Sequence, residues 1–230
     1  MNSRLLKQCV AEFVGTFTLI FVGVGAIANA TPTAGLGLLG IAFAHGLAIA
    51  VMVSATGAIS GGQLNPAVTF GLFVGGQMDA KKTIAYWISQ LAGGTAAALL
   101  CGSLIGMKAV ASGTPDIGLN ATGSAVVSTG QAIVIEAVLT FFLVFVVYGS
   151  AVDARAPKIG GLAIGLTVAL DIMFGGPLTG AAMNPARTFG PALASGHWNN
   201  HIVYWVGPLM GGALAGLIYG RFLIKESKAA

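Results

Sequence analysis

The sequence is dominated by long apolar stretches separated by short polar ones. Runs of about 20 mostly apolar residues lie at roughly 8–30, 36–57, 83–105, 130–152, 159–176 and 202–223. Each run is long enough to cross the ~30 Å hydrocarbon core of a bilayer as an α-helix. The pattern predicts an all-α membrane protein with six spanning helices in a single domain, residues 1–230. Residues 106–129, rich in Gly, Ser, Ala and Thr, are expected to form one longer external loop.

The composition agrees with this pattern and excludes an ordinary soluble domain, because 56% of the residues are hydrophobic and only 8% are charged. The net charge of +4 comes from scattered Lys and Arg at segment ends, which favours a topology signal over nucleic-acid binding. The cations that fall on one side of the six-span arrangement are Arg4, Lys7, Lys81, Lys82, Arg155, Lys158, Arg221, Lys225 and Lys228. Both termini are therefore expected in the cytoplasm. A cleaved signal peptide is a poor description of the first apolar run, which is too long and contains Glu12.

The chain repeats itself. Placing Glu12 on Glu136 aligns VAEFVGTFTLIFVGVG with VIEAVLTFFLVFVVYG, and the third and sixth spans share YWISQLAGG and YWVGPLMGG. The two halves, about 1–115 and 125–230, each hold three spans. Since three is odd, the second half must enter the membrane from the opposite side, which predicts an inverted repeat.

Two stretches interrupt the apolar pattern at matching places in the halves: SGGQLNPAVTFG at 60–71 and TGAAMNPARTFG at 179–190. Asn is a strong helix N-cap, and Pro suits the first helical position. Each stretch is thus expected to re-enter the membrane and start a half-helix, at 66–75 and 185–194, with the Asn-Pro pairs meeting near the midplane. Carbonyl groups before the half-helices are tolerated at that depth only along a water-filled path; the residues concerned are Gly61, Gly62, Gln63, Gly180, Ala181 and Ala182.

Over nearly its whole length the chain resembles the aquaporins, or major intrinsic proteins. The resemblance rests on AEFVGTF, SGGQLNPAVTFG, TGAAMNPARTFGPA and YWVGPLMGG. The second half is similar to the tonoplast intrinsic proteins of plants, whereas the short tails resemble bacterial, aquaporin Z-like proteins. The resemblance implies a homotetramer in a lipid bilayer, with one water pore per subunit; the tails favour a bacterial inner membrane.

The resemblance also implies roles for individual residues. Asn65 and Asn184, in the motifs Asn65-Pro66-Ala67 and Asn184-Pro185-Ala186, would donate amide hydrogens to passing water, and the two half-helix N-termini would raise a barrier to cations and protons. The blander alternative is that both Asn side chains only cap helices. The family's narrow outer filter would be formed by His45, Ile172, Ala181 and Arg187.

The filter departs from the pattern of strict water channels in the family, which often have Phe at the position of His45 and His at the position of Ile172. The change is expected to ease the passage of ammonia, hydrogen peroxide or urea besides water. Glycerol is not expected to pass, because Thr188 and Ala192 stand where glycerol channels of the family have an Asp and a basic residue. A lone His in an apolar span is usually a core residue, but the spacing of His45 before Asn65 favours the filter.

The roles of three acidic residues stay open, with two alternatives for each. Glu12 and Glu136 would either accept hydrogen bonds from the backbone of the re-entrant loop in their own half, which the resemblance favours, or carry protons as in an ion-coupled secondary transporter of a small solute. Asp171 would either pair with loop donors near the outer surface or tune Arg187 or His45. No catalytic, cofactor-binding or metal-ligating constellation is evident, so neither an enzyme nor a cofactor is expected.

Overall fold

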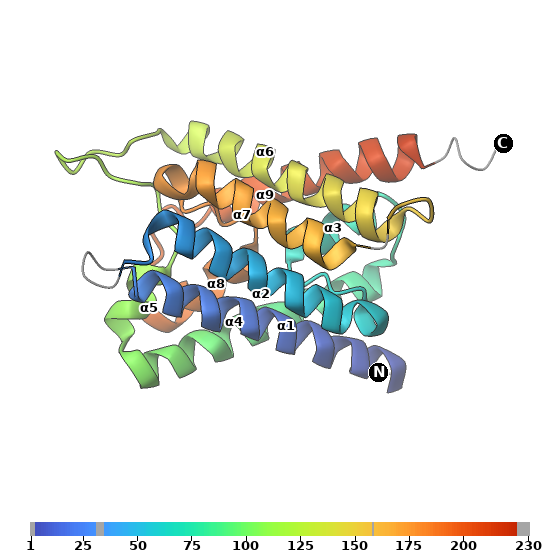
Figure 1. Ribbon diagram of the computed structural model, residues 1–230, viewed down its shortest axis with the longest axis horizontal. Helices are drawn as coiled ribbons and strands as arrows, with labels where there is room; N and C mark the ends of the chain where they lie inside the picture. The colour runs from blue at the N-terminus through green and yellow to red at the C-terminus, as the bar shows by residue number, and fades with distance from the viewer. Residues whose placement is uncertain (1–2, 31–34, 158, 225–230) are drawn as a thin grey trace.

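The computed structural model describes residues 3–30, 35–157 and 159–224, and these form a bundle of helices (Figure 1). Within them lie six helices long and apolar enough to cross a membrane. They are α1 (Ser3–Ala28), α2 (Gly37–Ser60), α4 (Ala80–Ile105), α6 (Thr129–Val147) continued by the π-helical η1 (Tyr148–Val152), α7 (Gly160–Thr179), and α9 (Val203–Ala215) continued by the π-helical η2 (Gly216–Leu223). The chain is thus a multi-pass membrane protein. Helix α1 begins and η2 ends at the same end of the bundle (Figure 1).

Two short helices complete a seventh crossing. Helix α3 (Pro66–Val74) has 9 residues and α8 (Pro185–Ser195) has 11. At 1.5 Å per residue they are roughly 14 and 17 Å long, so together they match the ~30 Å apolar thickness of a bilayer. Both begin within a residue of where the sequence pattern placed them.

Glycines let the half-helices pack closely on spanning helices. A Cβ atom at Gly94 of α4 would lie 2.8 Å from the carbonyl oxygen of Ala186 in α8, and one at Gly212 of α9 would lie 2.5 Å from that of Ala67 in α3. Such contacts are too short for any larger residue. Gly94 and Gly212 therefore serve helix packing inside one chain.

Two features differ from the expectations. The segment 106–129 is not loop throughout, because α5 (Met107–Gly113) follows α4 directly. Gly106, with a φ of 89°, ends α4, and Val110 is fully buried in the new helix. One short helix of two turns leaves too little periodicity to be recognised in a sequence. Helix α7 also runs past the expected end at 176, and carries Pro177 inside its last turn.

The expected cytoplasmic cations follow the alternation of the spans. Arg4 and Lys7 lie in the first turns of α1, Lys81 and Lys82 in the first turn of α4, and Arg221 in η2. Arg221 donates from Nε to the carbonyl oxygen of Val74, 2.8 Å away, and so ties η2 to the end of α3. Lys158, Lys225 and Lys228 lie outside the described residues.

Candidate functional site

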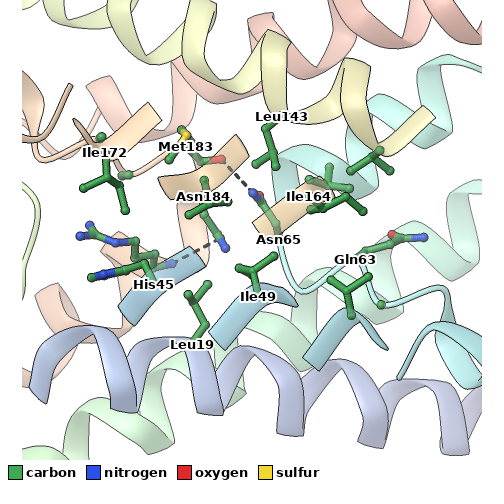
Figure 2. Close-up of a pocket in the computed structure, with 18 residues that line it drawn as sticks. Leu19, His45, Ile49, Gln63, Asn65, Leu143, Ile164, Ile172, Met183 and Asn184 are labelled. Carbon is green, nitrogen blue, oxygen red and sulfur yellow. Dashed lines mark hydrogen bonds between the residues drawn. The ribbon is translucent and has the colours of Figure 1, made fainter. Parts of the chain in front are cut away.

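The two re-entrant loops meet at their Asn residues. Asn65 caps α3 by accepting from the N–H of Ala67 at 2.8 Å, and Asn184 caps α8 by accepting from Ala186 at 2.9 Å and Arg187 at 3.3 Å. Each side chain also donates across to the other loop: Asn65 Nδ2 to the carbonyl of Met183 at 2.8 Å (Figure 2), and Asn184 Nδ2 to that of Leu64 at 3.0 Å.

This pairing adds to the role that the resemblance implied. An Asn amide carries two hydrogens, and the bond to the opposite loop uses one of them. The second hydrogen of each amide has no protein acceptor among the described hydrogen bonds. Both Asn side chains line the cavity described below. Capping, joining the loops and offering a donor to the cavity are therefore compatible functions of the same two side chains.

The loops hold strained backbone. Three residues of the loops have positive φ values, a region of backbone conformation that residues other than Gly rarely adopt: Leu64 at 54°, Ala181 at 42° and Met183 at 52°. Such conformations cost of the order of 1–3 kcal/mol each and persist where the surroundings fix them. Here the surroundings include two fully buried carboxylates, Glu12 and Glu136, one for each loop.

Glu12 binds the re-entrant loop between α2 and α3, which we call the inner loop. Its carboxylate accepts from the backbone N–H groups of Gln63 at 3.0 Å and Leu64 at 2.6 Å, from the hydroxyl of Ser60 at 2.6 Å and from the amide of Gln90 at 2.8 Å. Of these four donors, two are backbone N–H groups that lie between α2 and α3, outside either helix.

Glu136 binds the re-entrant loop between α7 and α8, which we call the outer loop, in the same way. It accepts from the backbone N–H groups of Ala182 at 2.9 Å and Met183 at 2.7 Å, and from the hydroxyl of Thr179 at 2.7 Å. A tyrosine completes each set, because the hydroxyls of Tyr86 and Tyr204 each donate at 2.8 Å to the carbonyl of the residue that starts its loop, Ser60 or Thr179. Residues aligned between the two halves of the sequence thus make equivalent contacts.

A narrow cavity of about 30 Å³ passes the Asn pair (Figure 2). All four residues expected to form the filter line it: His45, Ile172, Ala181 and Arg187. One water needs at least about 10–15 Å³ of such space, so the cavity has room for only a few water-sized molecules at a time. The apolar part of its wall is formed by Leu19, Ile49, Val53, Val68, Leu143, Val147, Ile164, Val168 and Met183.

The hydrogen-bond partner of the His45 ring shows which of its nitrogens carries a hydrogen. Its Nδ1 lies 2.8 Å from the carbonyl oxygen of Ile41, which can only accept, so Nδ1 carries a hydrogen. In the neutral ring, Nε2 is then an acceptor. Gly23 of α1 leaves the room that the Nε2 edge of the ring occupies, since a Cβ atom there would collide with it.

Arg187 is buried, with 6% of its surface exposed. In the described part of the chain, its Nε and Nη1 atoms have no hydrogen-bond partner. Arg187 lines both the narrow cavity and an outer vestibule of about 280 Å³, which also borders on Ile172 and Gly180. A buried guanidinium beside space for water is suited to binding a solute oxygen and to repelling cations.

Of the residues expected to supply pore carbonyls, some line the narrow cavity, one lines the outer vestibule and one lines neither. Gly62, Gln63 and Ala182 line the narrow cavity, and Gly180 lines the outer vestibule. Gly61 is not among the residues lining either space; its N–H bonds to the carbonyl of Gly57 and ends α2, with a φ of 96°. The sequence pattern placed Gly61 in the path because it marked the whole run before Asn65 alike.

Asp116 is a vestibule residue that sequence reasoning missed. It lies in the loop after α5, where it accepts from Asn200 Nδ2 at 2.8 Å and contacts His197 Nε2 at 3.0 Å. Partial burial raises the pKa of its carboxyl group, but hydrogen bonds from Asn200, the Ile117 N–H and His197 outweigh burial and hold that pKa below its usual value. A lone Asp in an aperiodic loop gives no signal that would have placed it at the channel mouth.

Asp171 is the residue for which the sequence left two alternatives open. It lies within α7, lines neither the narrow cavity nor the vestibule, and makes no hydrogen bond with any described residue, its Oδ2 atom being buried. Pairing with loop donors is therefore not found among the described residues, since the position is inside the membrane span and one helical step away from the pore-facing Ile172. The side chain turns instead toward a groove between α6 and α7.

Comparison with known proteins agrees with the fold and the motifs. The family model "Major intrinsic protein" matches residues 1–219. The chain is 45% identical to Aquaporin TIP2-1 of Arabidopsis thaliana, covering 97% of this chain and 90% of that protein, and 45% identical to Aquaporin TIP2-1 of Zea mays, covering 98% and 91%. The aquaglyceroporin from Plasmodium falciparum superposes with a TM-score of 0.76 at 23% identity, over 98% of this chain and all of that one. The chain belongs to the major intrinsic protein family, the aquaporins.

Proposed function

We propose that the protein is a passive transmembrane water channel that also conducts small neutral solutes and excludes protons and ions. The observation that carries the proposal is the convergence, at one narrow cavity inside a membrane bundle, of two half-helix N-termini and two Asn amides. The relatives named above are aquaporins, which supports the water-channel function.

The geometry supports a specific way of passing water while excluding charge. Asn65 and Asn184 have one amide hydrogen each for a water oxygen, and α3 and α8 direct their positive ends to the same place. A water held there as an acceptor turns its own hydrogens away, toward either exit. Cations meet a positive potential at the Asn pair and again at Arg187, so both kinds of site oppose ion passage.

We further propose that ammonia and hydrogen peroxide pass with water. Two of the four filter positions, Ile172 and Ala181, carry no polar side chain, so the side chains on one wall of the constriction offer neither donor nor acceptor. A wall of this kind imposes a smaller desolvation requirement on a weakly hydrated solute such as ammonia than on an ion. Glycerol, which is bulkier and needs several polar partners, is not a proposed solute.

The second candidate, an ion-coupled transporter, needs a carboxylate that exchanges ions or protons with the path. Glu12 and Glu136 are fully buried and engaged in four and three hydrogen bonds, respectively, that hold the loops. Using either as a carrier would release the strained backbone at each cycle. The channel is therefore the better supported function, and the family is one of channels.

Replacing Ile172 by His tests the solute selectivity. Because a His adds bulk and polarity to the apolar wall, the Ile172→His variant is expected to lower ammonia permeability at least tenfold while water permeability changes less than about threefold. Stopped-flow light scattering on proteoliposomes gives the water rate, and an internal pH dye gives the ammonia rate. Ile172→Val, which keeps an apolar wall, is the matched control and should conduct both as the parent does. Equal ammonia rates in parent, His variant and bare liposomes would overturn the proposed solute range.

We also propose an oligomeric state for the protein and an orientation in the membrane. The family resemblance supports a homotetramer with one pore in each subunit. The orientation with both termini in the cytoplasm is supported by Arg4, Lys7, Lys81, Lys82, Arg155 and Arg221. The relatives named above are plant proteins, so they do not add support to the expectation of a bacterial inner membrane.

A further inference from the structure

Gln63 forms one end of the narrow cavity, on the side of the bundle where α1 begins, which we call the inner side. Figure 2 shows Gln63 at the opposite end of the cavity from His45, with Asn65 and Asn184 between them. Gln63 is 8% exposed, and its backbone N–H donates to the carboxylate of Glu12 at 3.0 Å. Because the backbone is fixed in this way, the side chain is the adjustable part of Gln63.

The amide group of Gln63 is held by a sulfur atom. Its Nε2 atom donates to Sδ of Met78, 3.5 Å away, and this bond is weak because a thioether is a weak acceptor. A thioether cannot donate, so the contact assigns the nitrogen, and not the oxygen, to the side of the sulfur. The amide oxygen is buried and has no partner among the described residues, which leaves water in the cavity as its donor. The orientation of the amide at the cavity therefore depends on Met78.

Met78 lies close to the inner end of the path. It belongs to the segment 75–79 between α3 and α4, and its side chain is partly buried against the core. Met183, which lines the narrow cavity itself, is only 2% exposed. Met78 is thus the more accessible of these two methionines, and a solute that passes Gln63 toward the inner side comes next to its sulfur.

Hydrogen peroxide, one of the solutes proposed above, oxidises thioethers. The sulfur lone pair attacks one peroxide oxygen, the O–O bond breaks, and the departing hydroxide takes up the proton of the transferred oxygen. Sulfur loses two electrons and the peroxide gains them, so the products are methionine sulfoxide and water. The reaction needs no further reactant.

A sulfoxide would change the contact between Met78 and Gln63. An N–H···O bond needs about 2.7–3.2 Å between its heavy atoms, and the S–O bond adds to this length. The 3.5 Å between Sδ and Nε2 is too short to take an oxygen along that line. Since Met78 packs against the core and the backbone of Gln63 is fixed, the amide group is the part that shifts, and a cavity of about 30 Å³ has little room for it.

We propose that Met78 is a modification site at the inner end of the path, and that its oxidation by hydrogen peroxide moves the Gln63 amide into the cavity and lowers water flux. This inference rests on the proposed channel function and adds regulation of the channel by one of its proposed solutes.

Two substitutions of similar volume imitate the two states of Met78 without any peroxide. Met78→Gln supplies a carbonyl oxygen that can accept from Gln63 Nε2, whereas Met78→Leu supplies no acceptor. Water flux through Met78→Gln is expected to be at least about threefold lower than through Met78→Leu. Stopped-flow light scattering on proteoliposomes with equal amounts of intact protein measures the ratio. Equal flux in the two variants would overturn the proposal.

Treatment with millimolar hydrogen peroxide tests the modification itself. The parent is expected to lose water flux at least about threefold, in step with the fraction of Met78 sulfoxide that peptide mass spectrometry finds. Met78→Leu should keep the flux of its own untreated sample. Met210→Leu is the matched control, because Met210 is 58% exposed and lines neither the narrow cavity nor the vestibule. This control should lose flux as the parent does.

Three results of the peroxide experiment would overturn the proposal: Met78 that stays unoxidised, full flux in a parent whose Met78 is oxidised, or equal losses of flux in the parent and Met78→Leu. The untreated parent separates this inference from the channel function on which it rests. Flux equal to that of bare liposomes before any treatment is a failure of the channel function, whereas flux that oxidation of Met78 leaves unchanged is a failure of this inference alone.

Discussion

Val168→Trp is expected to reduce water flux at least tenfold, to the level of liposomes without protein. Val168 is 6% exposed and lines the narrow cavity from α7. An indole added to a space of about 30 Å³ leaves no room for a water. Water that crosses the protein through this cavity would then be blocked. Stopped-flow light scattering on proteoliposomes with equal amounts of protein measures the loss.

Leu166→Trp provides the control in the same helix. Leu166 is 46% exposed and faces away from the cavity, so an aromatic side chain there meets the surroundings of the bundle instead of the path. It should conduct water at the parent's rate. Equal flux in both Trp variants, with both eluting as intact protein, would mean that water does not pass through this cavity.

Glu136→Leu is expected to destabilise the protein by about 2–6 kcal/mol, because the buried N–H groups of Ala182 and Met183 each lose their acceptor at roughly 1–3 kcal/mol apiece. Folded proteins are stable by only about 5–15 kcal/mol, so much of the variant should fail to reach the native state. The strained Met183 would lose the contact that fixes it. Thermal unfolding followed by size-exclusion yield in detergent measures the effect.

Asp79→Ala calibrates that result. Asp79 is also a carboxylate that accepts a backbone N–H, that of Lys82 at 2.8 Å, but as an exposed helix cap. Its loss should cost about 1 kcal/mol. If Glu136→Leu unfolds no earlier than Asp79→Ala, the outer loop does not depend on its buried carboxylate.

The re-entrant half-helices could be predicted closely because local rules determine them. Asn-Pro at 65–66 and 184–185 supplies a cap and a first helical residue whatever the rest of the fold does, and the structure starts α3 and α8 there. The paired positions of Glu12 and Glu136 were likewise visible as a repeat. Periodicity and capping act over a few residues, which a sequence shows directly.

Contacts between distant segments could not be predicted in the same way. The bonds from Asn65 to Met183 and from Asn184 to Leu64 join residues about half the chain apart, and no local pattern names the acceptor. The same holds for Asp116 at the vestibule and for Asp171, whose surroundings depend on the rotation of α7 against α6. Ile172 and Asp171 are neighbours in α7, but they face different directions, so that Ile172 lines the narrow cavity and Asp171 does not.

The two halves also differ in a way that repeats alone hide. Gln90 donates to Glu12 at 2.8 Å and to Thr69 at 3.0 Å, whereas the aligned position in the sixth span is Pro208, which has no side-chain donor. The carboxylate of Glu12 therefore accepts one more hydrogen bond than that of Glu136.

The temperature dependence of water flux through the unmodified protein tests the central claim most directly. Proteoliposomes and bare liposomes are compared by stopped-flow light scattering, without any ion gradient and then with one. A passive channel predicts flux well above that of lipid, a lower activation energy than lipid and no response to the ion gradient. Flux equal to that of bare liposomes, or flux that requires an ion gradient, would contradict it.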